Sequence, residues 1–187
     1  MGNLVYHGSR IYFNEFVIDP GLSAYSDPAR LDEGYGIYMT EDFKVASDYG
    51  QYLYTINLEN SFITDFTSKV VVRDTILKLE QMLGINFKLY FNINEVIDYM
   101  MDGRLNVVNL DDDIYNYLDA SYKFYQHHGE YLESFEDNFR YHMKTCYHSL
   151  VGNVFKYKIP TFKEPLYICF RNPETLIIEN ISYTGEE

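Results

Sequence analysis

The hydrophobic periods along the chain constrain its fold more than any other feature. Short alternating or wholly apolar runs, typical of strands, lie near both ends, whereas residues 67–150 space their apolar positions as helices do. The pattern predicts an α+β fold, with one sheet made from both ends of the chain and a helical insertion between them. We expect strands at 4–6, 36–39, 52–58, 62–66, 154–159, 166–170 and 176–181, and helices at 70–83, 94–101, 111–126 and 130–150.

The 187 residues contain no repeat or linker-like stretch, so we expect residues 1–187 to form a single domain, with the helical insertion at about 67–150. A further short helix is expected to begin after Thr40, which is a suitable N-cap, and to end near Gly50. Glu41 and Asp42 would then lie at the positive end of that helix.

The formal net charge is −13, which argues against non-specific binding to a nucleic acid backbone. It leaves open a basic protein partner or a small anionic ligand. The sequence has no apolar run of membrane-spanning length and no signal-peptide pattern, so we expect a cytoplasmic protein that does not enter a membrane.

Metal binding is not expected. The two cysteines do not form a zinc motif, and the adjacent His127 and His128 are poorly placed to share one ion on a helix. Asp111, Asp112 and Asp113 are typical of a helix N-terminus, with a magnesium site as the less favoured alternative.

Three short motifs concentrate residues suited to ligand binding. The first strand is followed by His7-Gly8-Ser9-Arg10, the motif Gly34-Tyr35-Gly36-Ile37-Tyr38-Met39 contains the second strand, and the next helix ends in Ala46-Ser47-Asp48-Tyr49. Each motif alone has an ordinary structural explanation, for example a histidine that completes a turn. Their order and spacing together are less readily explained by chance.

Together the motifs resemble the ADP-ribosyltransferase superfamily, in the His-Tyr-Glu branch that includes diphtheria-type toxins and the poly(ADP-ribose) polymerases. The resemblance covers about the first sixty residues and implies an ADP-ribosyltransferase-like split mixed sheet. A shorter stretch at 104–112 is similar to a small phage-encoded ADP-ribosyltransferase that acts against CRISPR defence.

The resemblance implies that NAD is the substrate. Gly8 would bind the nicotinamide carboxamide through its main-chain N–H and C=O, and Tyr38 and Tyr49 would stack on the nicotinamide ring. His7, assisted by Ser9, would bond a ribose hydroxyl. Arg10 is a candidate for the pyrophosphate, with Arg30 a weaker one, although each also suits a solvated surface.

The family also places a catalytic glutamate at the start of a late strand, where it stabilises developing positive charge. Here Glu164 is the nearest acid before the strand expected at 166–170, and Pro165 favours an extended backbone at Glu164. Direct alignment instead puts Leu166 in the glutamate's position. Glu164 is therefore either the catalytic acid or a solvent-exposed loop residue, and Glu174 is a poorer candidate.

From this resemblance we expect an NAD-dependent mono-ADP-ribosyltransferase that modifies a macromolecule, more plausibly a protein than a nucleic acid. Such an enzyme would suit a phage or bacterial effector that acts in defence or against it. Two alternatives remain open: an NAD glycohydrolase that uses water as acceptor, and an inactive binding protein that occludes a basic partner.

Overall fold

The computed structural model describes residues 3–18, 36–105, 110–120 and 133–185. It confirms an α+β fold with a mixed sheet of seven strands in the described part of the chain. The strands are β1 (Leu4–Ser9), β2 (Ile37–Thr40), β3 (Tyr52–Asn57), β4 (Ile63–Asp65), β5 (Val154–Tyr157), β6 (Leu166–Cys169) and β7 (Ile177–Tyr183). The helices are α2 (Phe43–Ser47), α3 (Lys69–Leu83), α4 (Ile93–Met101), α5 (Leu110–Ala120) and α7 (Glu133–Leu150), with single 3₁₀ turns η2 (Phe87–Leu89) and η4 (Pro173–Thr175).

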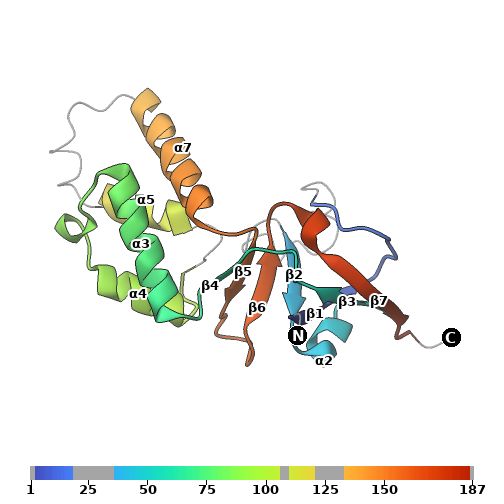
Figure 1. The fold of residues 1–187 in the computed structure, drawn as a ribbon. Coiled ribbons are helices and arrows are strands. Elements are labelled where there is room, and N and C mark those ends of the chain that lie inside the picture. Colours follow the sequence, from blue (N-terminus) through green and yellow to red (C-terminus); the bar gives the residue numbers. More distant parts are fainter. Residues whose placement is uncertain (1–2, 19–35, 106–109, 121–132, 186–187) are drawn as a thin grey trace.

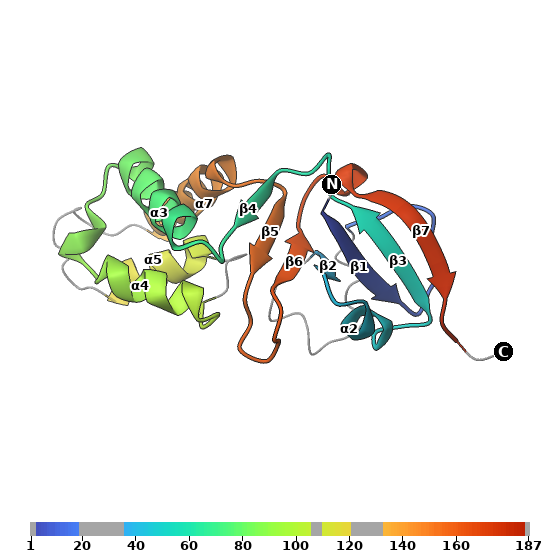
Figure 2. The same cartoon turned by 60° about the horizontal axis from the view of Figure 1, so that its bottom comes forward.

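The sheet combines both ends of the chain in the order β4-β5-β6-β2-β1-β3-β7. The pair β4–β5 is parallel and the other pairs are antiparallel. Strand β1 therefore lies inside the sheet, between a β2–β6–β5–β4 half and a β3–β7 half (Figure 2). This position puts the His7-Gly8-Ser9 motif in the middle of the sheet.

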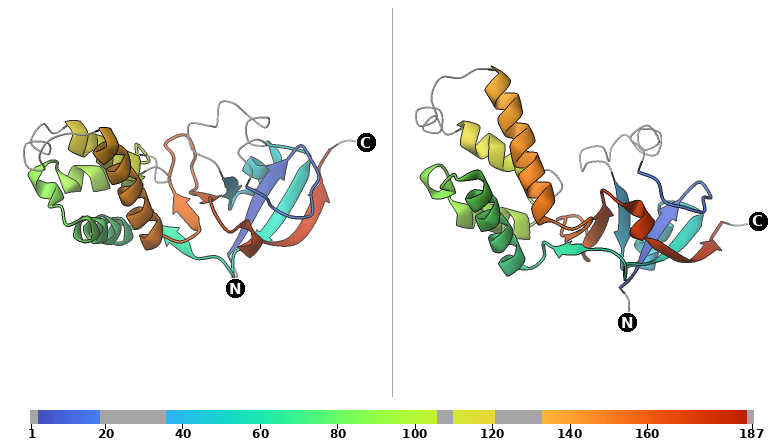
Figure 3. Two further views of the ribbon diagram at one scale, coloured as in Figure 1. Left: turned by 90° about the horizontal axis from the view of Figure 1, so that it is seen from above. Right: turned by 45° about the horizontal axis from the view of Figure 1, so that its top comes forward.

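The helices α3, α4, α5 and α7 follow β4 and precede β5, and we call residues 69–150 the helical insertion. The views in Figures 1 and 3 place it beyond the β4–β5 edge of the sheet. Its apolar side chains form one buried cluster that continues onto Phe155, Leu166 and Ile168 of the sheet. In the described residues, no helix is long and apolar enough to cross a membrane.

The two faces of the sheet carry different residues. A second buried cluster covers the face that includes Val5, Met39 and Tyr54, and the segment after β1 folds over it. There the ring of Phe13 stacks on Tyr54 with centroids 4.1 Å apart. We call this the His7 face, because His7 lies two residues after Val5 on β1 and therefore shares its face. The opposite face, which carries Tyr38 and Leu166, is the Tyr38 face.

The start of the short helix differs from the sequence expectation. Thr40 is the last residue of β2, and Asp42 is the N-cap of α2, where its carboxylate accepts a hydrogen bond from the Lys44 N–H at 2.9 Å. Thr40 pairs with Tyr6 and Leu166 on both sides, so the sheet retains it as a strand residue. The expected Thr40 cap was wrong by two residues.

Candidate functional site

Strands β1 and β2 share a single ladder pair in the described residues. Strand β1 pairs with β3 at six positions, from Leu4↔Asn57 to Ser9↔Tyr52, but with β2 at the single pair Tyr6↔Thr40. The ladder between the two central strands therefore ends before Gly8 within the described residues. We call the stretch beyond this pair, with Gly8 on β1 and Tyr38 on β2, the gap, or the β1–β2 split.

The main chain of Gly8 is directed into this gap. The N–H of Leu58 donates to the carbonyl of Asn3 at 3.2 Å. This bond shows which residues of β1 are hydrogen-bonded to β3. Because bonded and non-bonded positions alternate in an antiparallel pair, the N–H and C=O groups of His7 face β3, and those of Gly8 face β2. Gly8 thus presents one donor and one acceptor to the gap, which is the pair that a carboxamide needs.

The imidazole of His7 bridges the same gap. Its Nδ1 lies 2.7 Å from the main-chain oxygen of Tyr38. A carbonyl oxygen only accepts hydrogen bonds, so this contact assigns the proton to Nδ1, and in neutral imidazole it makes Nε2 an acceptor. The rings of Phe13, Phe16 and Tyr54 surround the imidazole with centroids 5.5 to 6.1 Å away. These contacts hold His7 in one orientation.

Tyr38 and Tyr49 lie near Gly8 on the face of the sheet opposite to His7. In the register set by Tyr6↔Thr40, Tyr38 and Gly8 belong to the same face, and His7 belongs to the opposite one. A Cβ atom built on Gly8 would be 3.2 Å from the Cβ of Tyr49, so Tyr49 begins directly beside Gly8. The structure therefore brings Gly8, Tyr38 and Tyr49 together on one face, with His7 reaching the gap from the other.

Helix α2 requires glycine at position 8. A Cβ on Gly8 would lie 1.8 Å from the carbonyl oxygen of Ala46, which is a severe clash with backbone. Gly50 is equally confined, because its Cβ would lie 2.0 Å from the carbonyl carbon of Ser9. Close packing of α2 on β1 is thus a reason for glycine at position 8, and the sequence alone did not indicate it.

Ser9 is the last residue of β1 and Arg10 follows it, and their side chains have different surroundings. The Ser9 hydroxyl donates to the Ile11 carbonyl at 2.8 Å and accepts from the Ile11 N–H at 3.1 Å, so it closes a local turn. Arg10 is exposed next to the backbone of Gly50. Gly34, Tyr35 and Arg30 lie outside the described residues.

Glu164 does not join this group. It is exposed and precedes β6, whose first residue, Leu166, is 8% exposed and pairs with Thr40. Because Thr40 is level with Tyr6, Leu166 is already two residue positions from the level of Gly8, and Glu164 precedes Leu166 outside the strand. Leu166 occupies the nearer position on the Tyr38 face.

Glu41, which the sequence predicts at the start of the short helix, has a different role in the structure. Glu41 accepts hydrogen bonds from the Tyr167 hydroxyl and from Lys156 Nζ, the latter at 3.2 Å. The hydrogen bond from Tyr167 lowers the pKa of Glu41, and burial raises the pKa of Tyr167. Tyr167 pairs with Met39, so this cluster lies on the His7 face and ties the end of β2 to β5 and β6. Only the pairing of distant strands reveals it.

No group of three or more His, Cys, Asp or Glu side chains in the described ranges is arranged to hold a metal ion. Asp111, Asp112 and Asp113 lie in the first turn of α5, as expected from the sequence, whereas His127 and His128 lie outside the described residues. Comparisons of the chain with protein-family profiles, with curated protein sequences and with solved structures found no match.

Proposed function

We propose that this protein is an NAD-dependent mono-ADP-ribosyltransferase that modifies a protein acceptor. The observation that carries the proposal is the split between β1 and β2, into which Gly8 directs a main-chain donor and acceptor. Tyr38 and Tyr49 flank Gly8 on one face, and they supply aromatic surfaces for a nicotinamide ring. The family resemblance of the three motifs gives this arrangement its chemical meaning.

In the proposed reaction, the bond between the nicotinamide nitrogen and ribose C1′ breaks, and its electron pair leaves with neutral nicotinamide. A nucleophilic group of the acceptor forms the new bond to C1′ and releases its proton. Gly8 orients the leaving nicotinamide, and Tyr38 and Tyr49 hold its ring. His7, fixed by the Tyr38 carbonyl and the surrounding aromatic rings, bonds a ribose hydroxyl through Nε2.

The remaining site assignments are proposals with less structural support. Arg10 is exposed and is suited to a pyrophosphate at the end of β1, whereas the Ser9 hydroxyl is already engaged with Ile11. Glu164 is the proposed acid that stabilises the positive charge on the ribose. Its distance from Gly8 along the sheet requires the ribose to extend toward the start of β6.

One observation favours a second function. The position on the Tyr38 face at the start of β6 is the buried Leu166, and Glu164 is exposed outside the strand. A site without an acid at this position favours a protein that does not react with NAD. Such a protein would bind a basic partner through its net charge of −13. Hydrolysis of NAD, with water as the acceptor, is the third outcome that an experiment must separate.

Incubation of the protein with NAD labelled in the adenylate, together with bacterial lysate, separates these functions. Transfer predicts a labelled protein band and equimolar nicotinamide, and both should disappear in His7→Ala but persist in the control Tyr141→Ala, a change at an exposed residue of α7. Nicotinamide release without labelled protein indicates hydrolysis. Neither product, together with no NAD binding by calorimetry, would refute the enzyme proposal.

A further inference from the structure

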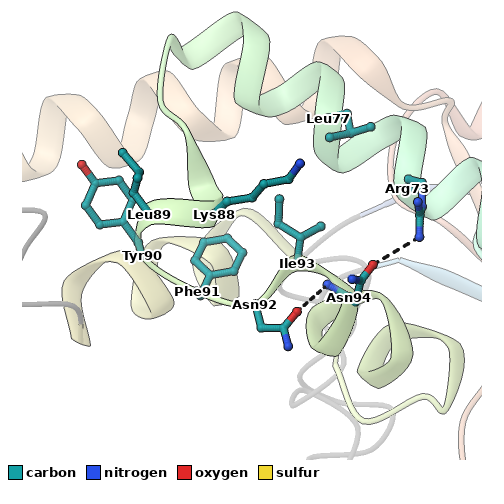
Figure 4. A pocket seen from close by; sticks show the side chains of 9 residues that line it. All are labelled: Arg73, Leu77, Lys88, Leu89, Tyr90, Phe91, Asn92, Ile93 and Asn94. Carbon is teal, nitrogen blue, oxygen red and sulfur yellow. Dashed lines mark hydrogen bonds between the residues drawn. The ribbon is translucent and has the colours of Figure 1, made fainter.

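A pocket of about 610 Å³ lies on the helical insertion, away from the β1–β2 split. It is bounded by α3, by the segment around η2 and by the start of α4 (Figure 4). In Figure 4, Lys88 extends from the η2 segment toward the α3 side, and Arg73 contacts Asn94 across the opening. The volume is within the range of ligand sites, roughly 300 to 1,000 Å³.

The walls of this pocket are held by local hydrogen bonds and ring contacts. Gly84 ends α3 in a left-handed conformation with φ of 66°, and the Glu80 carboxylate then accepts the Phe87 N–H at 2.7 Å. Phe91 packs between Phe87 and Tyr117, with centroids 5.2 and 5.5 Å away. These contacts fix the turn between α3 and α4, so a ligand would meet a preformed surface.

The charged side chains that line the pocket are positive, although the protein is acidic. The lining includes Arg73 and Lys88 and no carboxylate, although the chain has a net charge of −13. Arg73 donates to the neutral amide oxygen of Asn94 at 3.2 Å, so its charge is not neutralised there. By contrast, Lys69, one turn earlier on α3, is paired with Asp98 at 3.0 Å. The pocket therefore favours an anionic ligand.

The pocket also has exposed apolar edges. Leu77 on α3 is 38% exposed and Leu89 on η2 is 59% exposed, and both line it. A bare inorganic anion would leave these leucines in water, whereas an acidic ligand with aliphatic or aromatic side chains would cover them. A nucleic acid is disfavoured, because it presents a continuous row of phosphates, whereas the lining offers two cationic side chains.

We propose that the pocket between α3 and α4 binds an acidic segment of a partner protein, with carboxylates at Arg73 and Lys88 and an apolar side chain against Leu77 and Leu89. This binding goes beyond the proposed transfer reaction and does not depend on it. It requires no NAD, so its test and the test of transfer can fail separately.

Selection from a random twelve-residue peptide library displayed on phage tests the proposal. The full chain is the target, and the double variant Arg73→Glu/Lys88→Glu is used for counter-selection after circular dichroism shows that it is folded. The expected peptides carry at least two acidic residues next to a leucine or aromatic residue. Selected peptides without acids, peptides that bind the double variant equally well, or no enrichment would overturn the proposal.

Fluorescence polarisation with the best peptide then tests each part of the pocket. Lys88→Glu and Leu89→Ser should each weaken binding at least tenfold, whereas Lys78→Glu, at an exposed lysine of α3 outside the lining, should not. A loss only in Lys88→Glu, together with full competition by millimolar inorganic phosphate, would identify a simple anion site and overturn the peptide proposal.

Discussion

The Nδ1 atom of His7 lies 2.7 Å from the main-chain oxygen of Tyr38, so a side chain joins two strands where their main-chain pairing has ended. This contact gives the Tyr38 carbonyl a side-chain donor beyond the Tyr6↔Thr40 pair. It links the stability of the sheet to the site that the β1–β2 split creates.

The first prediction concerns this contact. His7→Ala leaves the half-buried Tyr38 carbonyl without its imidazole partner, which should lower the free energy of unfolding by about 1 kcal/mol and abolish ADP-ribose transfer. His7→Asn retains a short donor and should recover part of the stability without recovering transfer. Urea denaturation and labelled transfer measure the two effects. Unchanged stability in His7→Ala would show that the contact does not support the sheet.

The second prediction concerns Gly8. An alanine there would place its Cβ 1.8 Å from the Ala46 carbonyl oxygen, so α2 must move, at a cost of roughly 1–3 kcal/mol. Because Tyr49 follows α2, Gly8→Ala should also weaken NAD binding. The matched control is Gly84→Ala, which costs about 1 kcal/mol through its left-handed backbone but should leave NAD binding unchanged. Equal NAD affinity in both variants would contradict the placement of Tyr49.

The third prediction tests the acid. Glu164 is exposed, so Glu164→Gln should leave thermal stability unchanged; if Glu164 stabilises the ribose cation, transfer should fall roughly a hundredfold. Glu174→Gln, at an exposed residue of η4, is the control and should leave transfer unchanged. Full transfer in Glu164→Gln would show that the site works without this acid and carries Leu166 in its place.

The fourth prediction concerns Asp111, which is 4% exposed at the start of α5. Burial raises the pKa of Asp111 to about 6, with a smaller contribution from Asp112. A carboxyl group whose folded-state pKa is raised favours folding when protonated, so its ionisation should reduce stability as pH rises from about 4 to about 6.

Asp111→Asn removes this ionisation. The variant should be more stable than the wild type above pH 7, by on the order of 2 kcal/mol, and the difference should shrink below pH 4. Urea denaturation at pH 4, 6 and 8 measures it, with Asp74→Asn, at an exposed residue of α3, as the control. A difference that does not vary with pH would show that Asp111 does not titrate as described.

The sequence predicted the strands and the main helices because their residues repeat at strand or helix periods. For example, Val72, Ile76 and Leu79 are all buried on one side of α3. The pattern could not predict that Thr40 stays in β2, because the decisive contacts with Tyr6 and Leu166 come from distant strands.

The candidate site was predictable as a list of residues but not as an arrangement. The motifs indicated His7, Gly8, Tyr38 and Tyr49 together. Only the register shows that His7 and Tyr38 belong to opposite faces and that the Gly8 main chain faces the gap. Neither the contact of Gly8 with Ala46 nor the Glu41–Tyr167 hydrogen bond has a local sequence signal.

The most direct test of the account is the backbone amide resonance of Gly8 during a titration with nicotinamide. Spectra of ¹⁵N-labelled protein should show a saturable shift at Gly8, with smaller shifts at Tyr38 and Tyr49 and none at Tyr141. 3-Methylpyridine, which has the ring but no carboxamide, should leave Gly8 unshifted. If Gly8 does not shift at saturating NAD or nicotinamide, the β1–β2 split is not the nicotinamide site.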